Sequence, residues 1–364
     1  LRDPFIAAQR PSAPALLWRA GLSNLAAMWR TTPLQTLSAS LHEYFADPRL
    51  RQLFGRYATY VGSSPLLAPA TLMLIAHVEH EGVWTVQGGM KRIATTLQAL
   101  GEKHGAHYRC NSDVARIVLQ GQRVCGIQLA DGEHLPCDAV VFNGDSAALA
   151  SGLLGPDVAG ATAPTTAAQR SLSALTWCVQ ARARGFALDH HNVFFAADYA
   201  AEFKSIFGAQ RICDQPTVYL CAQDRGAAPP PNDTAERMLL LVNAPANGDS
   251  QDWSPTQVDD IAARSLALMA DCGLHLSIDH CTPTSPQQFN QLFPGTGGAL
   301  YGRANHGPMA SFARPGSRSR IAGLYLAGGS AHPGAGLPMA TLSGRLAAHS
   351  VASDLHLTST RNSA

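Results

Sequence analysis

A glycine-rich stretch near the C-terminus carries residue types that suit the binding of a large anionic group. Residues 324–326, Leu-Tyr-Leu, form a short apolar run that predicts a buried strand. Glycines follow at 328, 329, 334 and 336, and Pro338 suits the first turn of a helix because it has no N–H to leave unpaired. A helix N-terminus presents free N–H groups and the positive end of a dipole, both of which favour phosphate. We therefore predict a strand, a turn and a helix that seat a large anionic cofactor against the backbone.

A second group of polar residues, His-Val-Glu-His-Glu, occupies positions 77–81. Its spacing is not the H-E-x-x-H of a zinc-binding helix, and no second cluster of ligand types follows it. Charged and apolar residues alternate there, which is typical of a half-exposed strand. We expect no metal site in this chain. Its eight cysteines form no C-x-x-C pair and are expected to remain reduced.

Four stretches of this chain, taken together, resemble the carotenoid desaturases, the phytoene dehydrogenase family of FAD enzymes. One is the glycine-rich stretch, which resembles the family's C-terminal flavin-contacting segment. The others are YVGSSPLLAPATL at 60–72 with HVE at 77–79, GVWTVQGGM at 82–90 and LYGRANHG at 300–307. They keep the family's order and span residues 41–348. They are most similar to the hydroxyneurosporene and methoxyneurosporene dehydrogenases of purple bacteria, the 1-hydroxycarotenoid 3,4-desaturases.

The resemblance implies an FAD cofactor and indicates which residues contact it. These are Gly88, Gly89, Val114, Gly328, Gly329, Ser330, Gly334, Gly336, Leu337, Pro338 and Met339. The pair Gly88-Gly89 would let the backbone approach the flavin, and the backbone of Val114 would face the adenine. The same glycines would also suit tight turns between core elements. Many relatives in the wider amine-oxidase group carry an acidic residue at the position of Gly329, so we expect backbone groups, Ser330 or a missing segment to make that polar contact here.

Other polar residues keep two interpretations, and none is assigned as catalytic. His77 and Glu79 could line a substrate tunnel near the flavin or be structural. Arg303, His306 and His332 flank the glycine-rich stretch. They could orient the flavin or assist proton loss, or they could form ordinary hydrogen bonds under a loop. A Ser–His–Asp arrangement stays open by spacing, although the chain has no G-x-S-x-G motif.

The dinucleotide fingerprint with which family members begin, G-x-G-x-x-G, is absent from this sequence. The nearest stretch, residues 295–298, follows Pro294 rather than a strand and opens no helical pattern. The chain also begins at Leu1 rather than at Met. We expect an N-terminally truncated protein that lacks the βαβ unit for the ADP part of FAD, and the alternative is a complete protein that has lost the motif. The chain alone is expected to hold FAD poorly and to be inactive.

The apolar fraction and the charge of the chain limit the kinds of partner that it can have. Of the 364 residues, 46% are apolar and 15% are charged, which suggests much buried or lipid-facing surface. A net charge of +1 gives no indication of a nucleic-acid partner. No apolar run approaches the roughly 20 residues that span a bilayer. The Ala-, Leu- and Trp-rich residues 3–41 predict a helix that packs on the substrate domain or, alternatively, lies on a membrane surface.

Apolar periodicity predicts the elements that must position these residues. We expect an amine-oxidase-like FAD-binding fold of the α/β class, without its N-terminal βαβ unit, and an inserted α+β substrate domain with a mixed sheet. Residues 82–147 and 299–364 would form the remaining FAD-binding part, and residues 1–81 and 148–298 the substrate domain. Expected strands in the first part are 83–86, 108–110, 114–119, 123–129 and 139–143, the last buried on both faces. A helix should begin near Met90 and end at Gly101 and Gly105. In the substrate domain we expect strands at 175–179, 193–195, 217–221 and 238–242, a loop at 227–233 and a helix at 258–272.

The function implied by the resemblance is FAD-dependent 3,4-desaturation of an acyclic 1-hydroxy- or 1-methoxy-neurosporene in carotenoid biosynthesis. A flavin is needed because no protein side chain can accept a hydride. The expected partners are an acyclic carotenoid and a membrane surface. The expected location is cytoplasmic, peripheral to the inner photosynthetic membrane. The alternatives are a phytoene desaturase or carotenoid isomerase of the same family, a more distant amine oxidase, and an inactive fragment of an amine-oxidase-like flavoprotein.

Overall fold

The computed structural model describes residues 5–9, 11–21, 32–226 and 234–357. Its α-helices are α1 (Ala13–Ala20), α3 (Leu37–Tyr44), α4 (Pro48–Gly55), α5 (Leu74–Glu81), α6 (Lys91–Lys103), α7 (Ser146–Ala150), α8 (Tyr199–Phe203), α9 (Pro255–Asp271), α10 (Pro286–Leu292) and α11 (Leu337–Asp354). Its strands are β1 (Val114–Gln120), β2 (Arg123–Leu129), β3 (His134–Pro136), β4 (Val140–Phe142), β5 (Ser173–Gly185), β6 (His191–Phe194), β7 (Val218–Ala222), β8 (Glu236–Ala244), β9 (Leu274–Thr284) and β10 (Leu324–Leu326). Among these helices, none is both long enough and apolar enough to cross a membrane.

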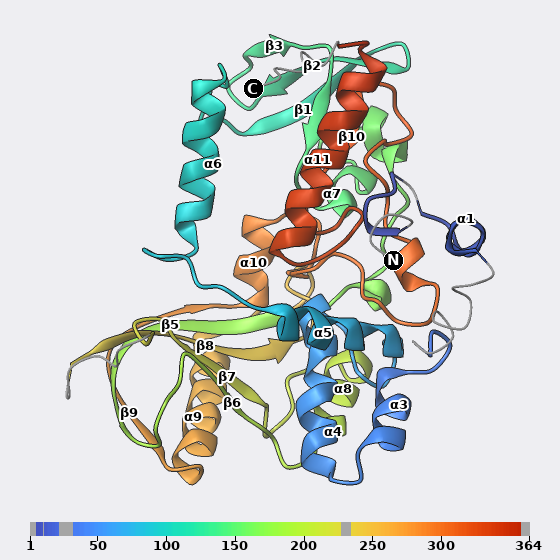
Figure 1. Ribbon diagram of the computed structural model, residues 1–364. Coiled ribbons are helices and arrows are strands. Elements are labelled where there is room, and N and C mark those ends of the chain that lie inside the picture. Colours follow the sequence, from blue (N-terminus) through green and yellow to red (C-terminus); the bar gives the residue numbers. More distant parts are fainter. Residues whose placement is uncertain (1–4, 10, 22–31, 227–233, 358–364) are drawn as a thin grey trace.

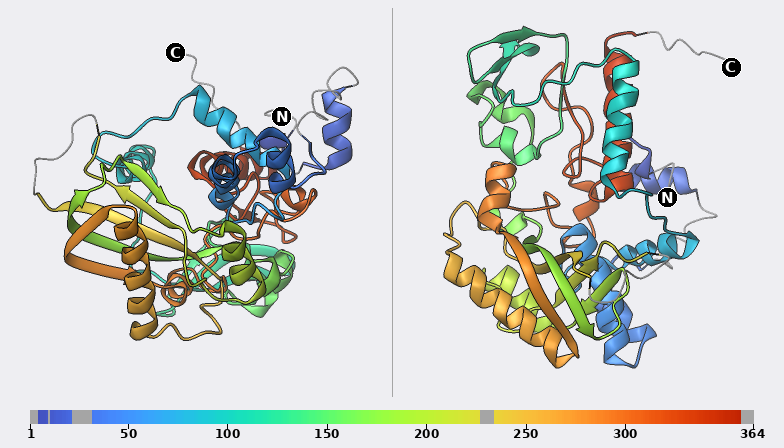
Figure 2. Two further views of the ribbon diagram at one scale, coloured as in Figure 1. Left: turned by 90° about the horizontal axis from the view of Figure 1, so that it is seen from below. Right: turned by 90° about the vertical axis from the view of Figure 1, so that its left-hand side faces the viewer.

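A five-stranded antiparallel sheet with the order β6-β7-β8-β5-β9 forms one end of the molecule (Figure 1). The first five residues of β5, 173–177, are all buried, so both faces of the sheet are covered there. After them only alternate residues, Val179 and Ala181, are buried, because side chains alternate between the two faces of a strand. The buried residues Val258 and Ile261 of α9 belong to the same core, and Figure 2 shows α9 lying along the sheet. The predicted strands 175–179, 193–195, 217–221 and 238–242 and the helix 258–272 are confirmed.

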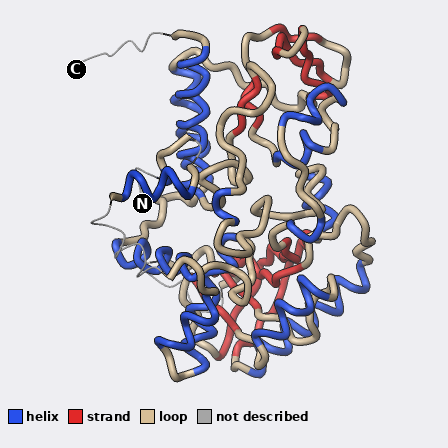
Figure 3. Tube along the Cα trace, turned by 90° about the vertical axis from the view of Figure 1, so that its right-hand side faces the viewer, coloured by secondary structure: helices blue, strands red, loops and turns tan. Residues whose placement is uncertain are grey.

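The other end of the molecule brings together two distant parts of the chain. Strand β4 pairs in parallel with β10, and β1, β2 and β3 form a separate antiparallel sheet. Ile117 of β1, Leu149 of α7 and Leu324 of β10 share one buried core. The five-stranded sheet is therefore inserted between segments that meet in space. In Figure 3 the strands form groups towards the two ends, with helices along the outside.

Two long helices belong to this end of the molecule, and one of them, α11, directly follows the glycine-rich stretch. Helix α11 begins at Leu337 with Pro338 in its first turn, and α6 covers 91–103, so both predicted helix starts are confirmed. Gly101 lies inside α6 rather than after it, while Gly105 follows it with a positive φ of 87°. Figures 1 and 2 show α6 and α11 running alongside each other, with both N-termini directed towards the five-stranded sheet.

Three predicted strands are wrong. Residues 83–86 and 108–110 are irregular, and the described residues provide no neighbouring strand that pairs with them. Val83 and Trp84 are 73% and 80% exposed, so the apolar residues of this segment do not pack on one face of a sheet. Residues 77–81 belong to helix α5 instead of a strand, because five residues are too few to separate a repeat of two from a helical repeat.

Two further features differ from expectation. Strand β4 is not buried on both faces, since Val141 is 47% exposed. Strand β9 was not predicted, because its outward residues are polar and most of the strand is exposed. The helix expected within residues 3–41 appears in part as α1, with Leu16 buried and Trp18 exposed. The rest of its apolar stripe, like the loop predicted at 227–233, lies outside the described residues.

Candidate functional site

The glycine-rich turn is held tightly between β4 and α11. Gly328 has a φ of 104°, and a Cβ added there would lie 2.8 Å from Oδ1 of Asn143, just after β4. The backbone N–H of Gly328 donates to Oγ of Ser343 on α11 at 2.7 Å. Only glycine fits this position. A residue with a side chain would be strained at this positive φ, and its Cβ would clash with Asn143.

The last glycine of the turn faces open space. Gly336, which caps α11, has a φ of 105°, and a Cβ added there would meet no atom within 4 Å. Within the described part of the chain no side chain caps the helix, and Leu337 is 49% exposed. The first N–H groups of α11 are therefore free to bind an anion at the positive end of the helix dipole.

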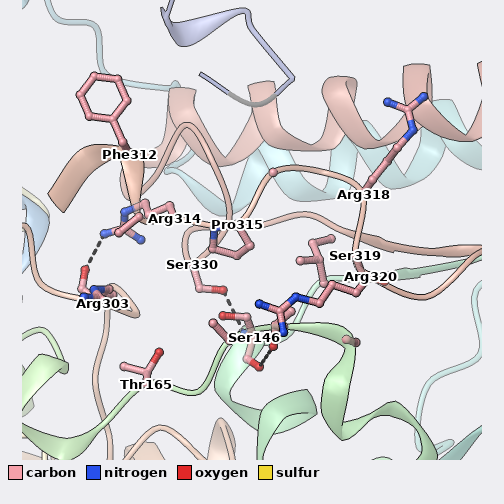
Figure 4. Close-up of a pocket in the computed structure, with 16 residues that line it drawn as sticks. Ser146, Thr165, Arg303, Phe312, Arg314, Pro315, Arg318, Ser319, Arg320 and Ser330 are labelled. Atoms are coloured by element: carbon pink, nitrogen blue, oxygen red, sulfur yellow. Dashed lines mark hydrogen bonds between the residues drawn. The ribbon is translucent and has the colours of Figure 1, made fainter. Parts of the chain in front are cut away.

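A cavity of about 310 Å³ lies beside this turn, and its polar lining is cationic (Figure 4). No carboxylate is among its described lining residues. Hydroxyl and guanidinium groups line it, from Ser146, Thr165, Arg303, Arg314, Arg320 and Ser330. Ser330 is tied to the rim of the cavity because its Oγ accepts the N–H of Ser146 at 3.3 Å. Such a lining suits phosphate or carboxylate oxygens.

Arg314 is the most deeply buried of these cations, at 6% exposure. Its guanidinium donates to three backbone carbonyl oxygens, those of Tyr301 at 3.0 Å, Arg303 at 2.9 Å and Gly329 at 2.8 Å. Burial lowers the pKa of Arg314 to about 10, and the charge of Asp145 opposes that shift. The side chain stays protonated at neutral pH and fixes the turn through Gly329. It also brings a positive charge to the cavity wall.

Of the polar residues that line this cavity, Arg303 and Ser330 were singled out from the sequence and the others were not. Arg314 and Arg320 lie in an irregular segment before β10, where no periodic pattern separates a buried arginine from an exposed one. Ser146 opens the short helix α7, in a part of the chain with no predicted role. Only the predicted residue Ser330 reaches the cavity from the glycine-rich turn. One sequence feature could have pointed to this cavity. Arg314 has no acidic neighbour in sequence and precedes the glycine-rich strand, turn and helix.

The predicted contact residues fall into two groups. Residues 328–330, 334 and 336–339 lie together on the turn and the start of α11. Gly88 and Gly89 lie at the start of α6 with φ of 82° and 88°, and a Cβ on Gly89 would meet nothing within 4 Å. Val114 begins β1 on a third element and is 37% exposed. The second group, Gly88, Gly89 and Val114, therefore lies on other elements than the glycine-rich turn.

The polar residues left with two interpretations differ in their surroundings. His332 is buried, with Nε2 donating to the carbonyl oxygen of Phe5 at 3.0 Å and Nδ1 without a hydrogen-bond partner. His306 lies under residues 62–67 instead, where its Nε2 accepts the N–H of Ser64 at 3.1 Å. Glu79 accepts from the hydroxyl of Tyr57 at 2.6 Å. Of the three residues that flank the turn in sequence, Arg303 lines the cavity and His306 makes an ordinary hydrogen bond under a loop.

The burial of His306 predicts a loss of stability in mild acid. Burial lowers its pKa from 6.5 to about 4, so between these values the unfolded chain binds more protons than the folded chain. The free energy of unfolding should therefore fall as the pH drops from about 6.5 towards 4. His306→Gln keeps an acceptor for Ser64 but does not titrate. Urea unfolding measures the free energy of unfolding at about pH 7 and pH 5. Between these pH values it should fall by about 1–2 kcal/mol less in His306→Gln than in the unmodified protein. Equal decreases in both proteins would contradict this prediction.

These features fit a cofactor that carries a diphosphate. The uncapped start of α11 and the arginine-lined cavity both favour negative charge. The open space at Gly336 and Gly89 allows a flat group to approach the backbone.

The chain matches the model of the family of flavin containing amine oxidoreductases over residues 18–352. It is 50% identical to hydroxyneurosporene desaturase of Rubrivivax gelatinosus over 99% of this chain and 69% of the relative. It is 43% identical to hydroxyneurosporene desaturase of Cereibacter sphaeroides over 97% of this chain and 70% of the relative. It is 32% identical to 1-hydroxycarotenoid 3,4-desaturase of a Flavobacterium species, over 84% of this chain and 62% of the relative.

Solved structures support the same fold. An oxidoreductase from Methanosarcina mazei matches with a TM-score of 0.53 at 15% identity, over 93% of this chain and 74% of that structure. A triple mutant of putrescine oxidase matches with a TM-score of 0.52 at 12% identity, over 89% of this chain and 69% of that structure. At these identities the likeness concerns the fold alone. With the family match over most of its length, the chain belongs to the flavin containing amine oxidoreductases, and it has their amine-oxidase-like fold.

Proposed function

We propose that this protein catalyses the FAD-dependent desaturation of an acyclic carotenoid, specifically the 3,4-desaturation of a 1-hydroxy- or 1-methoxy-neurosporene. The observation that carries the proposal is the 50% identity to a hydroxyneurosporene desaturase over 99% of the chain. Two further hydroxyneurosporene desaturases, at 43% and 40% identity, support it.

The chain's own residues would hold and orient the cofactor. We assign the diphosphate and adjoining parts of FAD to the glycine-rich turn and the uncapped start of α11, with Arg314 and Ser330 beside them. Gly88, Gly89 and Val114 remain proposed contacts on α6 and β1. The fixed hydrogen-bond donors and positive charges of such a site would replace water around the cofactor. When bound, FAD supplies the two-electron acceptor that protein side chains lack.

An apolar groove in the helical part of the molecule suits a polyene. It has a volume of about 450 Å³ and lies between α3 and α5, where its wall is mostly apolar. Leu41, Tyr44, Phe45, Met73 and Leu74 line it. A carotenoid has few polar groups, so its binding energy must come mainly from the burial of apolar surface. We propose this groove as part of the substrate path, in a substrate domain made of residues 1–81 and 148–298.

Exposed apolar residues beside the FAD-binding part support a further segment that covers it. Leu97 and Leu100 of α6 are 52% and 50% exposed, and Val141 on the edge of the two-stranded sheet is 47% exposed. Parallel strands are normally covered on both faces. We propose that a βαβ unit packs on this surface and completes an FAD-binding domain with residues 82–147 and 299–364. Limited proteolysis of the protein expressed from its complete gene should then leave α6 intact.

We also propose a peripheral position on the inner photosynthetic membrane. Several large apolar side chains of the helical part are exposed, including Tyr44, Leu50 and Leu53 at 69%, 40% and 49%. A membrane surface would cover them and would supply a substrate that is almost insoluble in water. Flotation with liposomes tests this placement, because a protein that stays at the bottom of the gradient would refute it.

Pigment analysis tests the proposed reaction. The complete gene is expressed in a host that makes 1-hydroxyneurosporene, and the extracted carotenoids are separated. We expect a product whose absorption lies at longer wavelength, because the polyene gains one conjugated double bond. A host that makes phytoene serves as the control for substrate. Conversion of phytoene without conversion of 1-hydroxyneurosporene would replace the proposal by that of a phytoene desaturase, and no conversion of either would refute desaturation.

A further inference from the structure

Two histidines and a cysteine meet at the edge of the five-stranded sheet, far from the glycine-rich turn in sequence. His191 opens β6 and lies opposite Cys221 of β7 in the antiparallel register, and His190 immediately precedes the strand. One ligand atom from each of the three side chains lies within 4.8 Å of the others. The sequence offered no signal for this cluster, because thirty positions separate its cysteine from its histidines and no metal-binding spacing results.

The hydrogen bonds of His190 leave one ring nitrogen available. Its Nδ1 lies 2.6 Å from the carbonyl oxygen of Arg225, and a carbonyl can only accept, so Nδ1 carries the proton. Nε2 then holds a free lone pair, and it faces Sγ of Cys221 at 3.6 Å. In a tetrahedral zinc site, bond lengths of about 2.3 Å to sulfur and 2.0–2.1 Å to nitrogen put these two atoms roughly 3.5 Å apart. The pair is therefore spaced as ligands of one metal would be.

The surroundings hold both histidines in place. The guanidinium of Arg225 is fixed by two hydrogen bonds of 2.7 Å to Glu236 and one of 2.9 Å to the carbonyl oxygen of Leu188, which steadies the carbonyl that orients His190. On the other side, Nδ1 of His191 lies 2.7 Å from the hydroxyl of Tyr219. Metal-binding histidines commonly use their second nitrogen in this way, and the bond fixes the ring for the metal.

We propose that His190, His191 and Cys221 bind a thiophilic divalent transition metal of the Zn²⁺ type, with solvent in the fourth position. A thiolate and two imidazoles form a ligand set that suits zinc and cobalt. His191 is exposed, so the metal can enter from solvent. Binding converts the Cys221 thiol to a thiolate and releases its proton to the solvent. The site would tie the start of β6 to β7 at the outer edge of the sheet, and it is independent of the proposed desaturation.

The test is a titration of the purified protein, free of any histidine tag, with Co²⁺ and then with Zn²⁺. We expect one Co²⁺ per chain with a thiolate-to-cobalt absorption band, and its displacement by Zn²⁺. Cys221→Ser should abolish the band, and His190→Ala should weaken binding beyond the roughly 10–100-fold that the loss of an orienting partner costs. Tyr219→Phe keeps all three ligands and should weaken binding about 10–100-fold.

Cys178→Ser is the matched control, since Cys178 is an exposed cysteine of the same sheet outside the cluster. It should bind Co²⁺ as the unmodified protein does. Circular dichroism of each variant without metal confirms that it is folded. The proposal is overturned if no thiolate band forms, or if Cys221→Ser binds as tightly as Cys178→Ser.

Discussion

Replacing Arg314 with leucine should lower the free energy of unfolding by about 3 kcal/mol, because it leaves the buried carbonyl oxygens of Tyr301, Arg303 and Gly329 without their donor. The loss is limited because the buried charge also disappears, and burial already disfavours that charge. The stability of Arg314→Lys should lie between that of the unmodified protein and that of Arg314→Leu. An ammonium lacks the planar set of donors with which a guanidinium reaches all three oxygens. Chemical denaturation measures the three proteins.

Arg211→Leu gives the matched control for the loss of an arginine. Arg211 pairs with Asp214 on the surface, where both side chains are largely exposed, so its removal should cost less than about 1 kcal/mol. In the protein expressed from its complete gene, Arg314→Leu should also weaken FAD binding, whereas Arg211→Leu should not. An Arg314→Leu protein as stable as the control would show that the guanidinium does not hold the turn.

Replacing Gly336 with valine should reduce the affinity for FAD at least about tenfold, which corresponds to about 1.4 kcal/mol. A Cβ added at Gly336 would meet no described protein atom within 4 Å, so the new side chain would extend into the space that we assign to the cofactor. The positive φ of 105° costs roughly 1–3 kcal/mol of stability in its own right. Flavin fluorescence during titration of the apoprotein gives the affinity.

Gly132→Val separates backbone strain from contact with the cofactor. Gly132 has a φ of 95° and equally open surroundings, but it lies in the turn between β2 and β3. Both variants should lose similar stability, and only Gly336→Val should lose FAD affinity. Equal FAD affinity in the two variants would remove Gly336 from the site.

The elements that could be predicted from sequence are those whose pattern is local. Residues 324–326, the glycines after them and Pro338 specify a strand, a turn and a helix start within one short window. The strands of the inserted sheet follow the same rule, since β5 and β8 consist of continuous buried runs and stretches in which every second residue is buried. The family of the protein could also be inferred from the sequence, because four separate motifs occur in the same order as in that family.

The features that escaped prediction depend on contacts between distant residues. Residues 83–86 have the composition of a strand, but a strand forms only beside a partner. Arg314 lines the cavity because the chain around residues 301–329 folds about it, and nothing within its own segment marks it as buried. The same applies to His190 and Cys221, which the pairing of β6 with β7 brings together.

Anaerobic reduction of the protein-bound flavin tests the central claim most directly. The protein expressed from its complete gene is loaded with FAD and mixed with 1-hydroxyneurosporene in detergent micelles without oxygen. We predict that the visible absorption of oxidised FAD is lost as a product with one more conjugated double bond appears in equal amount. Flavin that stays oxidised with the carotenoid but is reduced by an amine such as putrescine would contradict the proposed desaturation.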